Sequence, residues 1–151
     1  MQSITRLDIG QSGQITEIWQ QARAKSLFPV GLDWNDKQVI EELTQGWGWG
    51  LFVDGQVQAF ILGRQVADHW EINLLATRPG GWHKGQMKTL LSYVLEQRPK
   101  NCSIWLEAHE ENVPALRLYE SLGFEQVGLR PSYYGLDQAS VLYTLHSAFS
   151  A

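Results

Sequence analysis

The hydrophobic positions of the chain follow two periods, and each period predicts a different kind of element. Alternating apolar and polar residues, or a short apolar run bounded by turn residues, predict strands. Apolar residues spaced three and four apart predict amphipathic helices. The strand pattern covers residues 3–9, 51–53, 56–63, 69–77, 102–108, 124–129 and 139–146. The helical pattern covers residues 13–27, 36–43, 87–96 and 113–122.

The order of these elements predicts the fold class. One strand and two helices precede three consecutive strands, and the chain then alternates helix, strand, helix before a closing hairpin. Strands joined by tight turns pair antiparallel, whereas a strand–helix–strand crossover makes two strands parallel. We therefore expect one α/β (α+β) domain over residues 1–151, with a parallel pair inside a mixed, mostly antiparallel sheet and about four helices flanking it. Sites in such sheets form where neighbouring strands part.

Composition and charge narrow the class of protein. The 151 residues are 44% hydrophobic and carry a net charge of −4, which argues against a basic nucleic-acid surface. The sequence has no apolar run approaching the roughly 18 residues of a membrane span and no signal-peptide core at its start. Its single cysteine, Cys102, fits a reducing compartment and a small core position. We expect a cytoplasmic protein that binds neither nucleic acid nor membrane; its oligomeric state stays open.

Residues 105–124 carry the candidate chemistry. Glu107 lies near the end of a predicted strand, Asn112 caps the following helix, and Tyr119 lies on that helix. A proton acceptor and a proton donor on adjacent elements are what acyl transfer from a thioester to an amine requires. Taken singly, Glu107 would be a solvated charge and Tyr119 a residue at the core edge. Their joint placement favours catalysis.

The same segment resembles the GNAT superfamily of acetyl-coenzyme A N-acetyltransferases. The resemblance is nearest to RimI-type enzymes, which acetylate the N-terminal alanine of a ribosomal protein. It rests on Trp-Leu-Glu107, Asn112, the run from Leu118 to Phe124, and Arg130-x-x-Tyr133-Tyr134. It implies a splayed parallel strand pair, Glu107 as the general base and Tyr119 as the general acid that protonates the coenzyme A sulfur. By the same likeness, amides near residues 75–77 would stabilise the developing oxyanion.

The coenzyme site is expected on the loop that precedes the third helix. The superfamily loop, Gln/Arg-x-x-Gly-x-Gly/Ala, binds pyrophosphate through backbone amides and a helix N-terminus. Here only Gly85 of its three marked positions is retained, and Met87 stands at the close-approach position, although lysines nearby add positive charge. The alternative is that the glycines merely shape a surface turn. The residues expected to bind acetyl-CoA are Leu75, Ala76, Thr77, Trp82, His83, Lys84, Gly85, Gln86, Met87, Lys88, Asn112 and Tyr119.

The acceptor side is less well defined by the sequence. Arg130, Tyr133 and Tyr134 lie where related N-terminal acetyltransferases hold the peptide end, so with Glu107 they are the expected substrate-binding residues. A hairpin simply decorated with tyrosines is the competing explanation. The carboxylates of Glu107, Glu110 and Glu111 lack a second ligand cluster, so no metal is expected. With Asp68 and Glu71 they fit better as an acidic rim that attracts a cationic amine, and the simpler explanation for Glu110 and Glu111 alone is a solvated loop.

These observations predict an acetyl-CoA-dependent N-acetyltransferase that acts directly on a primary amine, preferably a protein or peptide N-terminus. The first alternative is the same chemistry on a small-molecule amine or a lysine. The second is a degenerate domain that binds coenzyme A or another ligand without catalysis, which the altered loop favours. Whether acetyl is the natural acyl group stays open as well.

Overall fold

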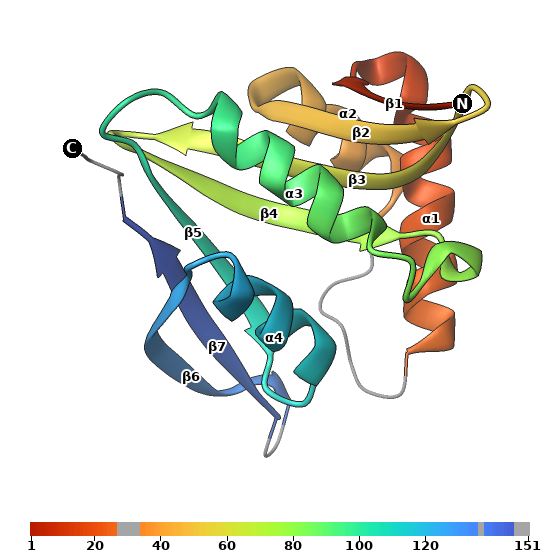
Figure 1. Ribbon diagram of the computed structural model, residues 1–151. Coiled ribbons are helices and arrows are strands. Elements are labelled where there is room, and N and C mark those ends of the chain that lie inside the picture. Colours follow the sequence, from red (N-terminus) through yellow and green to blue (C-terminus); the bar gives the residue numbers. More distant parts are fainter. Residues whose placement is uncertain (27–33, 136–137, 147–151) are drawn as a thin grey trace.

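The computed structural model describes residues 1–26, 34–135 and 138–146, and the side chains of these except 131–135 and 138–139. Seven strands form one sheet (Figure 1), and two short 3₁₀ turns cover Ile9–Gln11 and Pro79–Gly81. The strands are β1 (Gln2–Arg6), β2 (Trp47–Val53), β3 (Gln56–Val66), β4 (His69–Thr77), β5 (Ser103–His109), β6 (Glu125–Gly135) and β7 (Gln138–Leu145). The α-helices are α1 (Ser12–Lys25), α2 (Asp36–Gln45), α3 (Gln86–Gln97) and α4 (Val113–Ser121).

The sheet confirms the predicted mixed topology. Its strand order is β1-β2-β3-β4-β5-β7-β6, and only β4 and β5 pair in parallel within the described strands. Their register covers three pairs, from His69 with Ser103 to Glu71 with Trp105. Beyond Glu71, β4 continues to Thr77 beside β3 alone, while β5 continues to His109 beside β7. The central pair is therefore a fork that opens toward the carboxyl ends of both strands.

Two separate cores cover the two faces of the sheet. On one face, Leu90, Leu91 and Val94 of α3 and Tyr119 of α4 pack on the sheet. On the other, Ile15 and Ile18 of α1 and Val39 of α2 do so. Figure 1 shows α3 and α4 in front of the strands and α1 and α2 behind them. This three-layer arrangement buries both faces and leaves the fork as the break in the middle layer.

The strand β4 contains an irregularity beside the fork. Leu62 of β3 pairs with Leu74, but the next residue, Gly63, pairs with Ile72, so Asn73 has no partner in β3. One extra residue of this kind is a β-bulge, which bends the strand and redirects a side chain. Ile72 faces the α3–α4 core, whereas Leu74 faces the α1–α2 core. The bulge thus changes which face of the sheet the end of β4 presents.

Several predicted boundaries need correction. The strand β2 begins at Trp47 rather than at residue 51, because alternate glycines still leave a backbone able to pair with β1 and β3. The strand β6 runs through Pro131 to Gly135, which an edge strand permits since proline needs no ladder hydrogen bond there. The run Phe28-Pro29-Val-Gly31, which is expected from the sequence to break the first helix, lies outside the described residues.

Candidate active site

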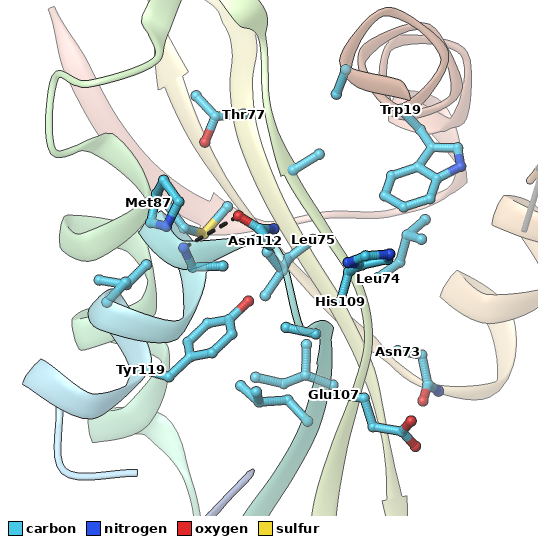
Figure 2. A pocket seen from close by; sticks show the side chains of 18 of the residues that line it. Trp19, Asn73, Leu74, Leu75, Thr77, Met87, Glu107, His109, Asn112 and Tyr119 are labelled. Carbon is cyan, nitrogen blue, oxygen red and sulfur yellow. Dashed lines mark hydrogen bonds between the residues drawn. The ribbon is translucent and has the colours of Figure 1, made fainter. Parts of the chain in front are cut away.

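A cavity of about 1280 Å³ occupies the fork between β4 and β5. Its walls come from both faces of the sheet, because it is lined by Trp19 and Glu42 on the α1–α2 side and by Met87 and Tyr119 on the α3–α4 side. Figure 2 shows side chains of both groups directed into the gap. A ligand can therefore approach the strand ends from either face, and two ligands can meet there.

The structure brings most of the predicted site residues together around this cavity. Lys84 is exposed and does not line it, and the side chains of Tyr133 and Tyr134 lie outside the described residues. The predicted residues that line it are Leu75, Ala76, Thr77, Trp82, His83, Gly85, Gln86, Met87, Lys88, Glu107, Asn112, Tyr119 and Arg130.

Glu107 enters the cavity from the α1–α2 face of β5. Its neighbours Leu106 and Ala108 are buried in the α3–α4 core, so strand alternation turns Glu107 the other way. Its Oε1 is 3.1 Å from Nη2 of Arg130, and its Oε2 accepts a hydrogen bond of 2.6 Å from Ser140 Oγ. These two contacts orient the carboxylate and still leave lone pairs on both oxygens for a proton from a ligand.

Tyr119 enters from the opposite face. It lies on α4, whose first turn is capped by Asn112 Oδ1 accepting from the amide of Ala115. Its ring is buried against Phe124 and Tyr143, with 5.9 Å between centroids in each pair. Figure 2 shows its hydroxyl directed away from α4, toward the gap and Leu75. Helical packing thus fixes the ring, and the phenolic oxygen is presented to the cavity.

Tyr143 is a second phenol in this core, but it has a different partner. Its hydroxyl donates to Glu120 Oε2 at 2.8 Å, and its ring is fully buried. Burial and the hydrogen bond to Glu120 raise the pKa of Tyr143 to about 12. A phenol so held is a poor proton donor and is directed at α4. Of these two phenols, Tyr119 is therefore the one that lines the cavity.

The amino end of α3 is suited to bind an anion. It begins after Gly85, whose φ of 74° favours glycine, and no side chain caps it. The first intrahelical hydrogen bond runs from Thr89 N to Gly85 O, so the amides of the preceding turn have no helical acceptor. The residues of this turn, Gly85 to Lys88, line the cavity, where a helix N-terminus favours negative charge.

The rest of this loop explains how it tolerates large side chains. Trp82 donates its indole N–H to the carbonyl of Thr77 at 2.8 Å, which ties the loop to the end of β4. The side-chain oxygen of Gln86 is buried without a hydrogen-bond partner among the described residues. It therefore offers a carbonyl acceptor to an amide-bearing ligand such as the pantetheine arm of coenzyme A. The residues present thus fit acetyl-CoA despite the altered motif.

Sequence reasoning missed a polar group on the α1–α2 side. Glu42 is buried on α2, yet it lines the cavity together with Arg64 and Asn73. Ser140, which holds Glu107, was missed as well. A glutamate within an amphipathic helix and an asparagine within a strand carry no local signal of this grouping. Only the strand register and the bulge bring them to the fork.

Other candidate features take structural roles. Cys102 is buried, and burial raises the pKa of its thiol, which opposes nucleophilic use. Among the described residues, no group of three or more metal-ligating side chains is arranged around a common point. Within the same part of the chain, no helix is long and apolar enough to span a membrane.

Comparisons with known proteins agree with this geometry. Residues 14–124 match the model of the acetyltransferase (GNAT) family. The chain is 28% identical over 137 residues to the [ribosomal protein bS18]-alanine N-acetyltransferase of Escherichia coli, covering 89% of this chain and 88% of the relative.

Solved structures share the fold. The crystal structure of the ribosomal-protein-S18-alanine N-acetyltransferase from Escherichia coli superposes with a TM-score of 0.89 at 23% identity, over 100% of this chain and 97% of the other. The structure of yncA from Salmonella typhimurium, a putative acetyltransferase with its cofactor acetyl-CoA, gives a TM-score of 0.80 at 17% identity, over 100% and 96%. The chain belongs to the acetyltransferase (GNAT) family and is an acetyl-CoA-dependent N-acetyltransferase.

Proposed function

We propose that this enzyme acetylates the free α-amine of a protein or peptide N-terminus, with Glu107 as general base and Tyr119 as general acid. The observation that carries the proposal is the position of the two groups. Both line one cavity, and they reach it from opposite faces of a sheet that is open between them. An acceptor on one face and a thioester on the other can then react through the fork without a covalent enzyme intermediate.

Glu107 makes the acceptor nucleophilic. An α-amine has a pKa near 8, so much of it is protonated at neutral pH and cannot attack a carbonyl. Glu107, oriented by Arg130 and Ser140, accepts the proton directly or through one water. The freed nitrogen forms the new C–N bond at the acetyl carbonyl carbon.

Tyr119 completes the transfer on the other face. Acetyl-CoA supplies the acetyl group as a thioester. As the C–S bond breaks, the electron pair moves to sulfur, and Tyr119 donates its phenolic proton there. Backbone amides near Leu75 and Thr77, in the part of β4 that has no neighbour on the fork side, are our candidates for stabilising the developing oxyanion.

The coenzyme site proposed here is the loop and first turn of α3 together with the open end of β4. The unpaired amides after Gly85 bind the pyrophosphate, Lys88 adds positive charge, and Gln86 and Asn112 contact the pantetheine arm. Asn112 also caps α4, and the two roles are compatible because its Oδ1 serves the cap while its Nδ2 remains for a ligand.

The preference for a peptide N-terminus rests on the half of the cavity on the α1–α2 side, which we call the acceptor half. Carboxylates of Glu71 and Glu107 line this half, which favours a cation. Trp34 and Trp105 line it too and offer apolar surface to the first side chains of a peptide. The relative in Escherichia coli carries a name that specifies an alanine of ribosomal protein bS18 as the acceptor, and an alanine has a free amine only at a chain N-terminus. The cytoplasm, where acetyl-CoA and new protein N-termini occur together, is the compartment that this proposal requires.

The direct test compares one peptide with a free N-terminus and the same peptide with a blocked one, both containing an internal lysine. We expect a mass increase of one acetyl group on the free peptide and none on the blocked peptide. Fragmentation should place the group on the N-terminal nitrogen. Acetylation of the lysine, or turnover only with a small-molecule amine, would instead indicate that the enzyme acts on lysines or small amines. Calorimetric titration with acetyl-CoA tests the alternative of a degenerate, non-catalytic domain, which absence of binding at millimolar concentration would favour.

A further inference from the structure

Asn73 faces Glu107 across the mouth of the fork. Each lies two residues beyond the last β4–β5 pair, which joins Glu71 to Trp105. Asn73 is also the residue that the β-bulge leaves without a partner in β3, and bulges near active sites redirect side chains. Figure 2 shows both side chains on the two strands that bound the gap, and both line the cavity. An amine that reaches Glu107 from the α1–α2 face therefore passes beside Asn73.

The amide of Asn73 is held in one orientation by Glu42. Asn73 Nδ2 donates to Glu42 Oε2 at 2.6 Å. A carboxylate only accepts hydrogen bonds, so the NH₂ group must face Glu42 and Oδ1 must point elsewhere. Among the described residues, no donor is bonded to this Oδ1, although the side chain is exposed to the cavity. The result is an oriented carbonyl acceptor beside the base.

Arg64 in turn holds Glu42. Glu42 Oε1 accepts from Arg64 Nε at 2.9 Å and lies 2.7 Å from Arg64 Nη2, and Arg64 Nη1 donates to Gln45. The Glu42 side chain is only 4% exposed, and a buried charge needs such pairing to be tolerated. The hydrogen bond that Arg64 donates to Glu42 raises the pKa of Arg64, so the guanidinium stays charged. The chain from Arg64 through Glu42 to Asn73 therefore leaves the amide little freedom to turn over.

We propose that Asn73 positions the acceptor: its Oδ1 accepts a hydrogen bond from the attacking nitrogen while Glu107 removes a proton from that same nitrogen. The inference rests on the proposed function in requiring a primary amine at the fork and Glu107 as its base. A protonated primary amine has three N–H bonds, of which Glu107 takes one. A second bond to Asn73 fixes the rotation of the nitrogen, so that its lone pair is directed at the thioester once the proton has left.

A neutral carbonyl suits this position better than another carboxylate. Negative charge near an ammonium group raises its pKa, and this amine has to lose a proton before it can react. The acceptor half already contains Glu71 and Glu107. Asn73 holds the nitrogen without adding to that charge, while the charge of Glu42 is compensated by Arg64.

The first experiment measures steady-state kinetics of Asn73→Ala with the acceptor and acetyl-CoA varied separately. We expect the KM for the acceptor to rise about tenfold, the loss typical of one hydrogen bond to a charged group. The kcat should change less than threefold, and calorimetric affinity for acetyl-CoA should stay the same. A purely structural role for Asn73 would disturb coenzyme binding and thermal stability as well.

A second variant tests whether Glu42 acts through Asn73. In Glu42→Gln the new amide can donate to Asn73 Oδ1, so the Asn73 amide reverses and presents its NH₂ to the ammonium. We expect the acceptor KM to rise about as much as in Asn73→Ala, and the double variant to be no worse than either single one. Glu41→Gln removes the same charge from an exposed position on the same helix and is the matched control. It should leave both KM values unchanged.

The outcomes separate this inference from the proposed function. If the wild-type enzyme acetylates the free peptide and Asn73→Ala keeps the wild-type acceptor KM, the inference is wrong and the proposed function stands. Additive losses in the double variant would likewise refute the coupling of Glu42 to Asn73. If the wild type acetylates no peptide, the proposed function fails, and the same comparison is made with a small primary amine. Equal affinity of wild type and Asn73→Ala for that amine would overturn the inference.

Discussion

The two halves of the cavity are built differently. On the α1–α2 side, functional groups are side chains tied to one another: Arg130 and Ser140 hold Glu107, and Glu42 holds Asn73. On the α3–α4 side, the helix N-terminus and the open edge of β4 present backbone groups. The difference teaches where substitution is tolerated. Backbone amides survive a change of side chain, which explains how Trp82 and Met87 can stand in a loop that still suits a coenzyme.

The same contrast predicts where single substitutions act. On the α1–α2 side, where we propose that the acceptor binds, substituting a side chain removes the interaction entirely. On the α3–α4 side, where we propose that the coenzyme binds, it removes only an interaction that supplements the backbone amides. Effects on turnover should therefore be large for Glu107, the proposed base, and for Tyr119, the proposed proton donor. Effects on coenzyme affinity should be small for any one lysine.

Glu107→Gln is expected to have the largest effect. The amide keeps the size of the side chain but cannot accept a proton, so kcat/KM at neutral pH should fall about 100-fold, the lower range for general base catalysis. The remaining rate should follow the fraction of free amine and rise until the pH exceeds the amine pKa near 8. A pH–rate series checks this. Glu111→Gln, at an exposed position in the next turn, is the control; an unshifted profile in Glu107→Gln would point to another base.

Tyr119→Phe should reduce kcat at least tenfold with little change in coenzyme affinity. The ring and its packing against Phe124 and Tyr143 remain, and only the donated proton is lost. Turnover and calorimetry on the same preparation measure the two quantities. Tyr93→Phe, on α3 against Trp49 and outside the cavity lining, controls for loss of a phenol. Unchanged turnover in Tyr119→Phe would remove this residue from the mechanism.

The fold and the elements that carry Glu107 and Tyr119 could be predicted from the sequence for one reason. Period two and period 3.6 record which face of each element is buried, and that fixed the order of elements, the parallel pair and the strand end carrying Glu107. The bulge at Asn73 could not be predicted in this way. One inserted residue does not alter the apolar pattern recognisably, and the bulge is evident only from the pairing of β4 with β3. The contacts of Glu107 with Arg130 and Ser140 depend on non-local strand pairing in the same way.

The tryptophans show a second limit of sequence reasoning. From the sequence alone, Trp34, Trp47 and Trp49 are expected to pack the first helices against the sheet, with an acceptor groove near Trp47 as the alternative. Trp34 does pack in the α1–α2 core, but Trp47 contacts Trp70 in the other core, and Trp49 contacts Tyr93 of α3. Alternation assigns Trp47 and Trp49 to one face of β2 but cannot say which helices cover that face.

Lys88 and Lys84 differ in their expected contribution to acetyl-CoA affinity. Lys88 lines the cavity at the first turn of α3, whereas Lys84 is exposed outside it. Lys88→Ala should weaken acetyl-CoA binding about threefold, consistent with one exposed charge near an anion, and Lys84→Ala less than twofold. Calorimetry at two ionic strengths measures both, and the difference between the variants should shrink at high salt. A tenfold loss for either lysine would mean that side chains, not backbone amides, dominate this half.

Tyr143→Phe should have the smallest effect on turnover and a measurable one on stability. Removing the buried hydroxyl deletes its hydrogen bond to Glu120, at a cost of about 1 kcal/mol near neutral pH. The pKa of Tyr143 in the folded protein, about 12, exceeds that of an unfolded tyrosine, about 10. This group therefore stabilises the fold fully below pH 10, and the contribution is lost as the pH rises through 12.

Urea unfolding of wild type and Tyr143→Phe across that range measures the difference directly. The stability gap between the two proteins should narrow as the pH rises from 10 to 12, because only the wild type carries this titrating phenol. Since the ring beneath Tyr119 is unchanged, kcat should stay within about twofold. A gap that is independent of pH would mean that Tyr143 titrates normally. A large loss of kcat would mean that the hydroxyl of Tyr143, rather than the packing of its ring, supports the proton donor in the fork.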